Sequence, residues 1–264
     1  MKKAGYLVIF FLFIQTGYSQ ITNIQPFLRT KGEEGFKITL KTAPEFKSGN
    51  TDVAKVEGGF AGRYVRGNHL FLLLLEGAYA EALSEAYMRK TFEHLRYRYK
   101  LSDLVGLELF SQHEYDEFRR IDLRALGGAG PRFTFLSSKI FEMAFGTAYM
   151  LEFNRNSVGA FSDSGEESTV HRWSSYLHFD LDITKKISFF STTYIQPRFD
   201  QFSDFRFLND NSLNFKIAKH FTFFIKGFFS YDSRPPQSVE SLDVTLQGGF
   251  GINYSPKKTQ NENQ

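Results

Sequence analysis

Cysteine is absent from the 264 residues of this sequence. Its absence excludes a disulfide framework, a thiolate metal site and a lipoprotein anchor. An excess of either charge is also missing, because 32 Lys and Arg residues stand against 29 Asp and Glu residues. A net charge of +3 without a clustered basic stripe argues against a nucleic-acid partner.

Long apolar runs are missing as well. The longest run beyond the amino-terminal segment, Leu70 to Leu75, is far below the ~18 residues of a transmembrane helix, and helical periodicity is almost absent. The sequence contains instead 31 Phe and 13 Tyr, with 17% aromatic and 23% charged residues. This combination suggests a chain that is apolar on one side and ionic on the other.

The amino-terminal segment has the pattern of a secretory signal peptide. Lys2 and Lys3 form a positive region, and Leu7 to Ile14 form an apolar region that is too short to span a bilayer as a helix. Gly17 and Ser19 supply small residues at the −3 and −1 positions, so we expect residues 1–19 to be cleaved before Gln20. A retained membrane anchor is the alternative.

Strict alternation dominates the rest of the chain. In the segment 242–254, every even position is apolar or Gly and every odd position is polar or Gly, as expected of a strand with one apolar and one polar face. The same pattern recurs in the segments 94–101, 120–135, 141–153, 172–183 and 221–231. Globular strands usually run for ~5–6 residues, whereas tilted membrane strands need ~9–11. The pattern favours a transmembrane β-barrel, with a soluble sandwich as the alternative.

The alternation predicts an all-β, antiparallel transmembrane β-barrel of about twelve strands over residues 20–254, followed by a polar tail at 255–264. Ten strands is the alternative, because Pro44 interrupts the first strand and the pattern over 69–80 is blurred. The expected strands cover residues 35–46, 52–65, 69–80, 90–101, 105–116, 119–136, 140–153, 169–183, 187–199, 203–217, 221–232 and 239–254.

The connections between these strands predict the orientation of the barrel. With the amino terminus in the periplasm, the connections at 66–68, 102–104, 137–139, 184–186 and 218–220 are short and periplasmic. The longer connections at 81–89, 154–168 and 233–238 are then external. The 154–168 loop has little apolar content, so we expect it to be mobile.

Three features of the sequence point to a known family. They are Ser48-Gly49-Asn50-Thr51 before a strand, the Arg96-Tyr97-Arg98-Tyr99 strand, and the segment 120–132 with its Leu126-Gly127-Gly128-Ala129-Gly130 core. In these features the sequence resembles a domain-of-unknown-function family of salt-induced outer-membrane proteins. The likeness covers roughly residues 45–254. The resemblance implies an outer-membrane barrel and brings no established reaction, cofactor or substrate.

Enzymatic chemistry has one candidate. Ser111 and His113 share the face that we assign to lipid, and lipid-modifying barrels use such residues. A Ser–His hydrolase needs a carboxylate or amide to orient the imidazole, and the outward neighbours Leu123, Ala125 and Gly127 supply none. We therefore expect no enzymatic activity, with a lipid-modifying enzyme that uses Ser111 and His113 as the alternative.

Metal sites are not expected either. The six histidines are scattered, and the carboxylates beside His178 are better explained as partners of arginines. Calcium could bind Asp163, Glu166 and Glu167, but a solvated loop is the simpler interpretation.

The predicted inward face is ionic, which keeps charges out of lipid, where a central Arg or Lys costs about 2–4 kcal/mol. Short turns should place Arg98 opposite Glu108 and Arg206 opposite Asp232. The expected lumen-lining residues are Arg96, Arg98, Glu108, Arg124, Arg132, Glu142, Glu152, Arg172, Asp180, Asp182, Arg206, Lys226 and Asp232.

Long side chains of both signs should largely occlude such a lumen. The alternative is a thin, anion-favouring slot left open by small residues, namely Gly128, Gly130, Ala144, Gly146 and Ala148.

The sequence thus predicts a non-enzymatic outer-membrane protein of a Gram-negative bacterium. Its role would be envelope-structural or the passage of small solutes through a narrow ionic lumen. Expected partners are outer-membrane lipid and lipopolysaccharide, and the barrel-assembly machinery during insertion. The sequence names no solute.

Overall fold

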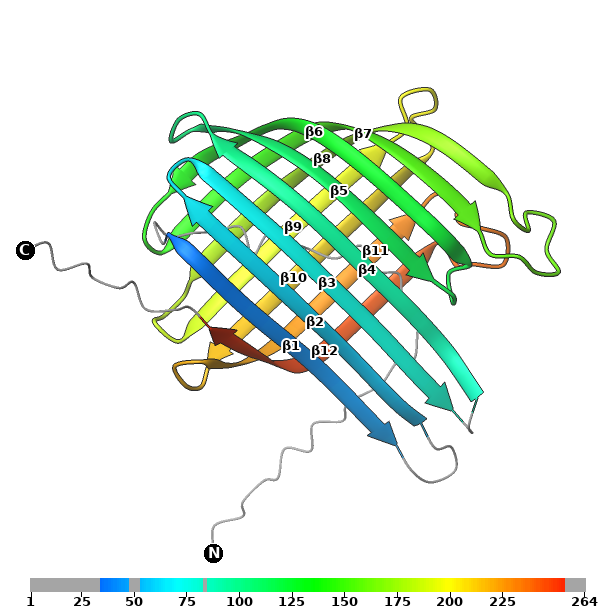
Figure 1. The fold of residues 1–264 in the computed structure, drawn as a ribbon, viewed down its shortest axis with the longest axis horizontal. Coiled ribbons are helices and arrows are strands. Elements are labelled where there is room, and N and C mark those ends of the chain that lie inside the picture. The colour runs from blue at the N-terminus through cyan, green and yellow to red at the C-terminus, as the bar shows by residue number, and fades with distance from the viewer. Residues whose placement is uncertain (1–33, 48–52, 83–84, 255–264) are drawn as a thin grey trace, which may run out of the picture.

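The computed structural model describes residues 34–47, 53–82 and 85–254. These residues form twelve antiparallel strands in one closed barrel, in which each strand pairs with its sequence neighbours and β1 pairs with β12 (Figure 1). The strands are β1 (Gly35–Lys47), β2 (Val53–Arg66), β3 (His69–Ala82), β4 (Glu85–Lys100), β5 (Val105–Asp116), β6 (Ile121–Ser137), β7 (Phe141–Asn156), β8 (Glu167–Asp182), β9 (Ile187–Pro197), β10 (Phe205–Lys216), β11 (Phe221–Asp232) and β12 (Leu242–Tyr254).

The predicted all-β barrel of twelve strands is confirmed, and the alternative of ten is wrong. The strand with Pro44 is present, but its pairing with β12 stops at Thr42, because proline has no N–H to donate to a ladder. The predicted signal peptide, the Ser48–Thr51 motif and the polar tail lie outside the described residues.

The side chains are sorted opposite to those of a water-soluble protein. On β5, Leu107 and Leu109 are 47% and 58% exposed, whereas Glu108 between them is 6% exposed. The same alternation runs through β8, where Trp173 and Leu177 point outward and Arg172 and Tyr176 are buried. The barrel therefore has an apolar exterior and a polar interior, as the alternation predicted.

The described residues include no helix that is long and apolar enough to cross a membrane.

The blurred alternation of β3 has a simple cause. Leu70, Leu72 and Leu74 point inward and are almost completely buried, while Phe71 and Leu73 between them are exposed. The inward leucines pack with three residues of the neighbouring strands, Ala61, Val65 and Phe92. The inward face of β3 is thus apolar over this stretch, so no polar residue distinguishes it from the outward face.

One facing prediction is wrong. The alternation over 120–135 predicts Ile121 on the outer face with Leu123, and Asp122 on the inner face. Ile121 is instead 3% exposed, and the side chain of Asp122 is 42% exposed and pairs with Arg155. The register between β6 and β7 shifts between Ile121 and Leu123. A bulge of this kind inserts one extra residue and reverses the faces before it, so the predicted alternation holds only from Leu123 onward.

The connection between β7 and β8 also differs from its prediction. Both strands are longer than expected, so the connection covers only residues 157–166. Polar groups anchor it: Asp163 pairs with Arg120 at 2.8 Å and accepts a hydrogen bond from the backbone N–H of Gln237 at 2.8 Å. Burial raises the pKa of Asp163, but these hydrogen bonds outweigh burial and hold the pKa below its ordinary value. Polar contacts thus take the place of the missing apolar ones, and the mobility of the connection stays a prediction.

The glycines of β6 and β7 do not leave a slot. A Cβ at Gly128 would lie 2.4 Å from the ring of Phe110, and one at Gly146 would lie 2.2 Å from the ring of Tyr176. At Gly130 the obstacle is backbone, because a Cβ would lie 2.0 Å from the carbonyl oxygen of Thr147. These glycines admit two aromatic rings and a close approach of two strands, so the alternative of a slot at this position is wrong.

We predict that Gly130→Ala destabilises the barrel by about 1–3 kcal/mol, because the added methyl group must displace a backbone carbonyl. The measurement is the urea midpoint of the heat-modifiable, folded band on a detergent gel. Gly227→Ala on β11 is the matched control, since nothing lies within 4 Å of a Cβ there. Equal midpoints for the two variants would contradict this account.

Candidate functional site

The interior of the barrel is divided into a largely filled part, which holds a cavity of only about 40 Å³, and an open part. The filled part begins with a network around Glu108 on β5. Its two carboxylate oxygens lie 2.7 Å from Arg96 and 2.8 Å from Arg98. Tyr176 of β8 donates a hydrogen bond to the same carboxylate at 2.8 Å, and Arg132 of β6 donates to the Tyr176 hydroxyl at 3.1 Å. Four strands are thereby connected across the lumen.

A second network surrounds Glu152 on β7, whose side chain is completely buried. One oxygen lies 2.6 Å from Arg206 of β10, and the other lies 3.5 Å from Arg172 of β8. Arg206 continues to Asp232 at 3.0 Å, and Arg172 continues to Asp204 at 3.1 Å. Charges this deep need partners, because an unpaired buried charge is far more costly than a paired one.

Both ion pairs predicted across hairpins are confirmed. Arg98 stands opposite Glu108 in the β4–β5 register, and Arg206 stands opposite Asp232 in the β10–β11 register. A short turn fixes which residues of its two strands face each other, so such pairs can be predicted from local sequence.

The other expected lumen residues either pair with an opposite charge or lie beside a cavity. Arg132 pairs with Glu142 at 2.6 Å, Arg124 with Glu114 at 3.3 Å, and Lys226 with Asp210 at 3.0 Å. Asp180 is completely buried beside the large cavity described below, and Asp182 is half-buried there.

The partner residues Glu114, Asp204 and Asp210 were missed by the sequence analysis. Glu114 and Asp210 occupy even-numbered positions of β5 and β10, which point inward. The alternation alone was therefore sufficient to predict them as lumen residues. Asp204 lies in the β9–β10 connection, where alternation gives no signal.

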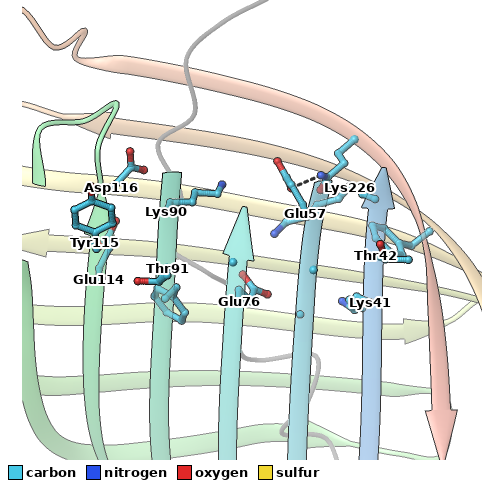
Figure 2. Close-up of a pocket in the computed structure, with 17 residues that line it drawn as sticks. Lys41, Thr42, Glu57, Glu76, Lys90, Thr91, Glu114, Tyr115, Asp116 and Lys226 are labelled. Carbon is cyan, nitrogen blue, oxygen red and sulfur yellow. Dashed lines mark hydrogen bonds between the residues drawn. The ribbon is translucent and has the colours of Figure 1, made fainter. Parts of the chain in front are cut away.

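The open part consists of two cavities, a larger one lined by β1, β2 and β8–β12 and a smaller one lined by β1–β5, β11 and β12. A cavity of about 590 Å³ opens at the end of the barrel with the short β8–β9 and β10–β11 turns. A smaller cavity of about 70 Å³ lies toward the opposite end and includes Lys41, Glu76 and Lys90 from β1, β3 and β4 (Figure 2). Lys41 and Phe224 line both cavities, so the two cavities adjoin at this pair.

The Lys41–Phe224 pair forms a constriction. The Lys41 ammonium lies 5.2 Å from the centre of the Phe224 ring, a distance at which a cation and a π-system attract each other. The ring lies against β12, where a Cβ at Gly249 would be 2.4 Å from it. Glycine at this position lets the ring lie against the wall of the barrel.

The larger cavity is rich in positive charge. Its lining contains two carboxylates, Asp180 and Asp182, and seven cationic residues, which are Lys37, Lys41, Arg63, Lys185, Lys186, Lys216 and Lys219. Charges of one sign within low-dielectric walls concentrate ions of the other sign. We refer to this cavity as the basic vestibule.

The enzyme alternative requires a correction. The sequence analysis found no carboxylate beside His113, because it considered only outward neighbours on β6. On the other side, Glu93 of β4 stands opposite His113, and its carboxylate lies 3.8 Å from the imidazole Nδ1. This separation exceeds hydrogen-bond distance, and both side chains are more than half exposed. The pair therefore lacks the preorganisation that a catalytic imidazole needs.

Metal chemistry has no visible site in the described part of the chain. No group of three or more His, Asp or Glu side chains is placed there to hold an ion.

The family assignment follows from the sequence match. The profile of the family "Protein of unknown function, DUF481" matches residues 44–254. The chain belongs to this family. The resemblance noted from the sequence is thus confirmed. No curated protein matches this DUF481 chain.

Solved structures with a similar arrangement are barrels as well. A structure described as the NanC porin is 11% identical and covers 82% of this DUF481 chain and 97% of its own, with a TM-score of 0.46. The KdgM porin is 11% identical over 84% and 99%, with a TM-score of 0.46. The translocator domain of the autotransporter NalP from Neisseria meningitidis is 10% identical over 85% and 89%, with a TM-score of 0.48.

We predict that Glu152→Gln lowers the stability of this DUF481 barrel by about 3 kcal/mol or more, because it leaves Arg172 and Arg206 buried beside a neutral amide. Urea unfolding in detergent, followed by tryptophan fluorescence, measures the loss. Asp103→Asn is the control. Asp103 pairs with Lys100 but its side chain is 99% exposed, so the loss of this pair should leave the stability almost unchanged. A Glu152→Gln barrel as stable as the control would show that the network does not hold the interior together.

Proposed function

We propose that this protein resides in the outer membrane and passes small anionic solutes along one side of its lumen, without catalysing a reaction. Membrane residence is supported by the closed sheet. Lipid tails cannot form hydrogen bonds, and closure leaves no edge strand whose backbone groups would face them unpaired. The exposed Phe and Leu side chains of the exterior provide the matching surface. Lipid and lipopolysaccharide would then contact this surface, and the barrel-assembly machinery would insert it.

The orientation follows from the connections. The start of β1 and the end of β12 lie at the same end of the barrel (Figure 1), which also carries the short turns. Short turns face the periplasm in outer-membrane barrels. The basic vestibule would therefore open to the periplasm, and the anchored 157–166 connection would lie outside.

The observation that carries the passage role is the contact of two lumen cavities at Lys41 and Phe224. A wholly structural barrel of this width could fill its interior throughout, as the Glu108 and Glu152 networks do on the other side. Here a lysine and one ring separate two spaces, and the larger space is cationic. A path of this kind favours small anions and excludes bulky solutes.

An envelope-structural role is the competing function, and planar-bilayer recording separates the two. We predict that the wild-type protein shows small openings, and that Phe224→Ala increases their conductance several-fold, because the ring narrows the path. Phe110→Ala is the matched control. Phe110 is also an inward phenylalanine that lies against a glycine, but it belongs to the filled part.

An increase in conductance for Phe110→Ala as large as that for Phe224→Ala would contradict the proposed path. An absence of openings in all three proteins would instead favour the structural role.

We predict anion preference from the vestibule. The triple variant Lys185→Gln, Lys186→Gln and Lys219→Gln removes three positive charges from its lining, so the reversal potential in a salt gradient should move toward cation preference. The effect should shrink at high salt because exposed charges are screened. Lys139→Gln, in the β6–β7 turn and outside the vestibule lining, should leave the potential unchanged. A triple variant with wild-type selectivity would contradict the proposed solute class.

A further inference from the structure

The outer surface of four consecutive strands carries polar side chains where an apolar wall is expected. These side chains are uncharged, half-buried and in the central parts of their strands. We call them the polar belt, and its members are Thr147 of β7, Ser175 of β8, Ser191 and Thr193 of β9, and Asn209 and Asn211 of β10.

Hydrogen bonds connect the belt along and across the strands. Thr147 and Ser175 stand opposite each other with their hydroxyl oxygens 3.1 Å apart. Asn209 donates to the hydroxyl of Thr193 at 2.9 Å, and Asn211 donates to the carbonyl oxygen of Asn209. An amide has two N–H donors and an oxygen with two acceptor positions. Each asparagine therefore has hydrogen-bonding capacity beyond the bonds named here.

The belt lies within the apolar band and not at its margin. On β10, Phe205 and Phe207 precede the asparagines on the outward face, and Leu213 and Phe215 follow them. On β9, Phe189 precedes the belt residues and Ile195 follows them. Polar headgroups of a lipid could reach residues at either end of the strands, but the centre of the band meets only hydrocarbon.

The opposite wall of the barrel has no such belt in its described residues. The outward positions near the centre of β12 are Leu246 and Gly248, and those of β3 are Leu73 and Leu75. Leu246 is 74% exposed. The contrast shows that the belt belongs to one side of the molecule, although the same alternation pattern builds both sides.

We infer that the polar belt is the contact surface for a second copy of this chain within the membrane. The inference rests on the membrane placement proposed above and goes beyond the passage role. Polar groups that face hydrocarbon are costly unless a partner satisfies them. Lipid tails offer no donor or acceptor, and the belt has no charge that would select an ionic partner. Amides and hydroxyls donate and accept, so two copies related by a twofold axis present complementary groups to each other.

The position of the belt fits this role in a second way. The strands that carry it, β7 to β10, also carry Glu152, Arg172 and Arg206 of the inner network. The interior behind the belt is therefore cross-linked by ion pairs. No belt residue lines the basic vestibule or the smaller cavity beside Lys41, so two copies could associate without sharing or blocking their solute paths.

Cysteine cross-linking tests the inference with no background, because the natural chain has no cysteine. Asn211→Cys would be produced in outer membranes, oxidised mildly and run on a non-reducing gel. We expect a dimer band that a thiol reductant removes. Leu246→Cys on β12 is the matched control, since it is exposed on the wall without a belt, and it should give at least several-fold less dimer.

Two outcomes would overturn the inference: an Asn211→Cys protein that stays monomeric, or a Leu246→Cys protein that cross-links equally well. A second measurement avoids the sulfur chemistry. Asn209→Leu/Asn211→Leu should abolish the dimer that an amine-reactive cross-linker traps in the wild type, while the heat-modifiable band of the folded barrel stays unchanged. Persistence of that dimer would also contradict the inference. A wild-type protein without heat-modifiable migration would refute the membrane placement instead, so the two failures are distinguishable.

Discussion

Closure of the sheet is the constraint on which the rest of this structure depends. A sheet of twelve strands that closes on itself has no edge strand, so most of its inter-strand donors and acceptors are used within the protein. The same closure encloses one face of every strand. Side chains that alternate along each strand are thereby divided between an outer surface and a confined interior, and each charged residue must find its partner in that interior.

The interior meets this requirement unevenly. Between β4 and β10, arginines and carboxylates connect strands that are not neighbours, as Arg206 does with Glu152. Buried ion pairs contribute little net stability relative to apolar packing, but breaking one is costly. They therefore act as geometric restraints on the wall they span. Where alanine or glycine lines the interior, as Ala43, Gly58 and Ala61 do, the side chain cannot form such a restraint, and space remains beside it.

The local sequence was sufficient to predict the features that depend on alternation along a strand or on a short turn. The twelve strands, the orientation of their faces and the pairs Arg98–Glu108 and Arg206–Asp232 all follow from alternation within a hairpin.

Features that depend on distant strands were not predictable. The Lys41–Phe224 constriction joins the first strand to the eleventh, and the anchoring of Asp163 needs residues from two other connections. The glycines of β6 and β7 were misinterpreted for the same reason, since the rings that cover them come from β5 and β8. Ile121 was assigned to the wrong face because a bulge interrupts the alternation, and no clear signal in the sequence marks that bulge.

The seam between β1 and β12 is short compared with the other pairings. It consists of five residue pairs, from Ile38–Tyr254 to Thr42–Phe250, whereas β1 and β2 share thirteen. Every other pairing joins strands that are consecutive in the chain, so it can form as a hairpin with a small loss of chain entropy. The seam joins the two ends of the barrel and has by far the greatest separation in sequence. Pairings of high contact order form late and slowly. Folding of this barrel should therefore have one kinetic bottleneck, the meeting of its first and last strands, and an open twelve-stranded sheet should be the species that precedes it.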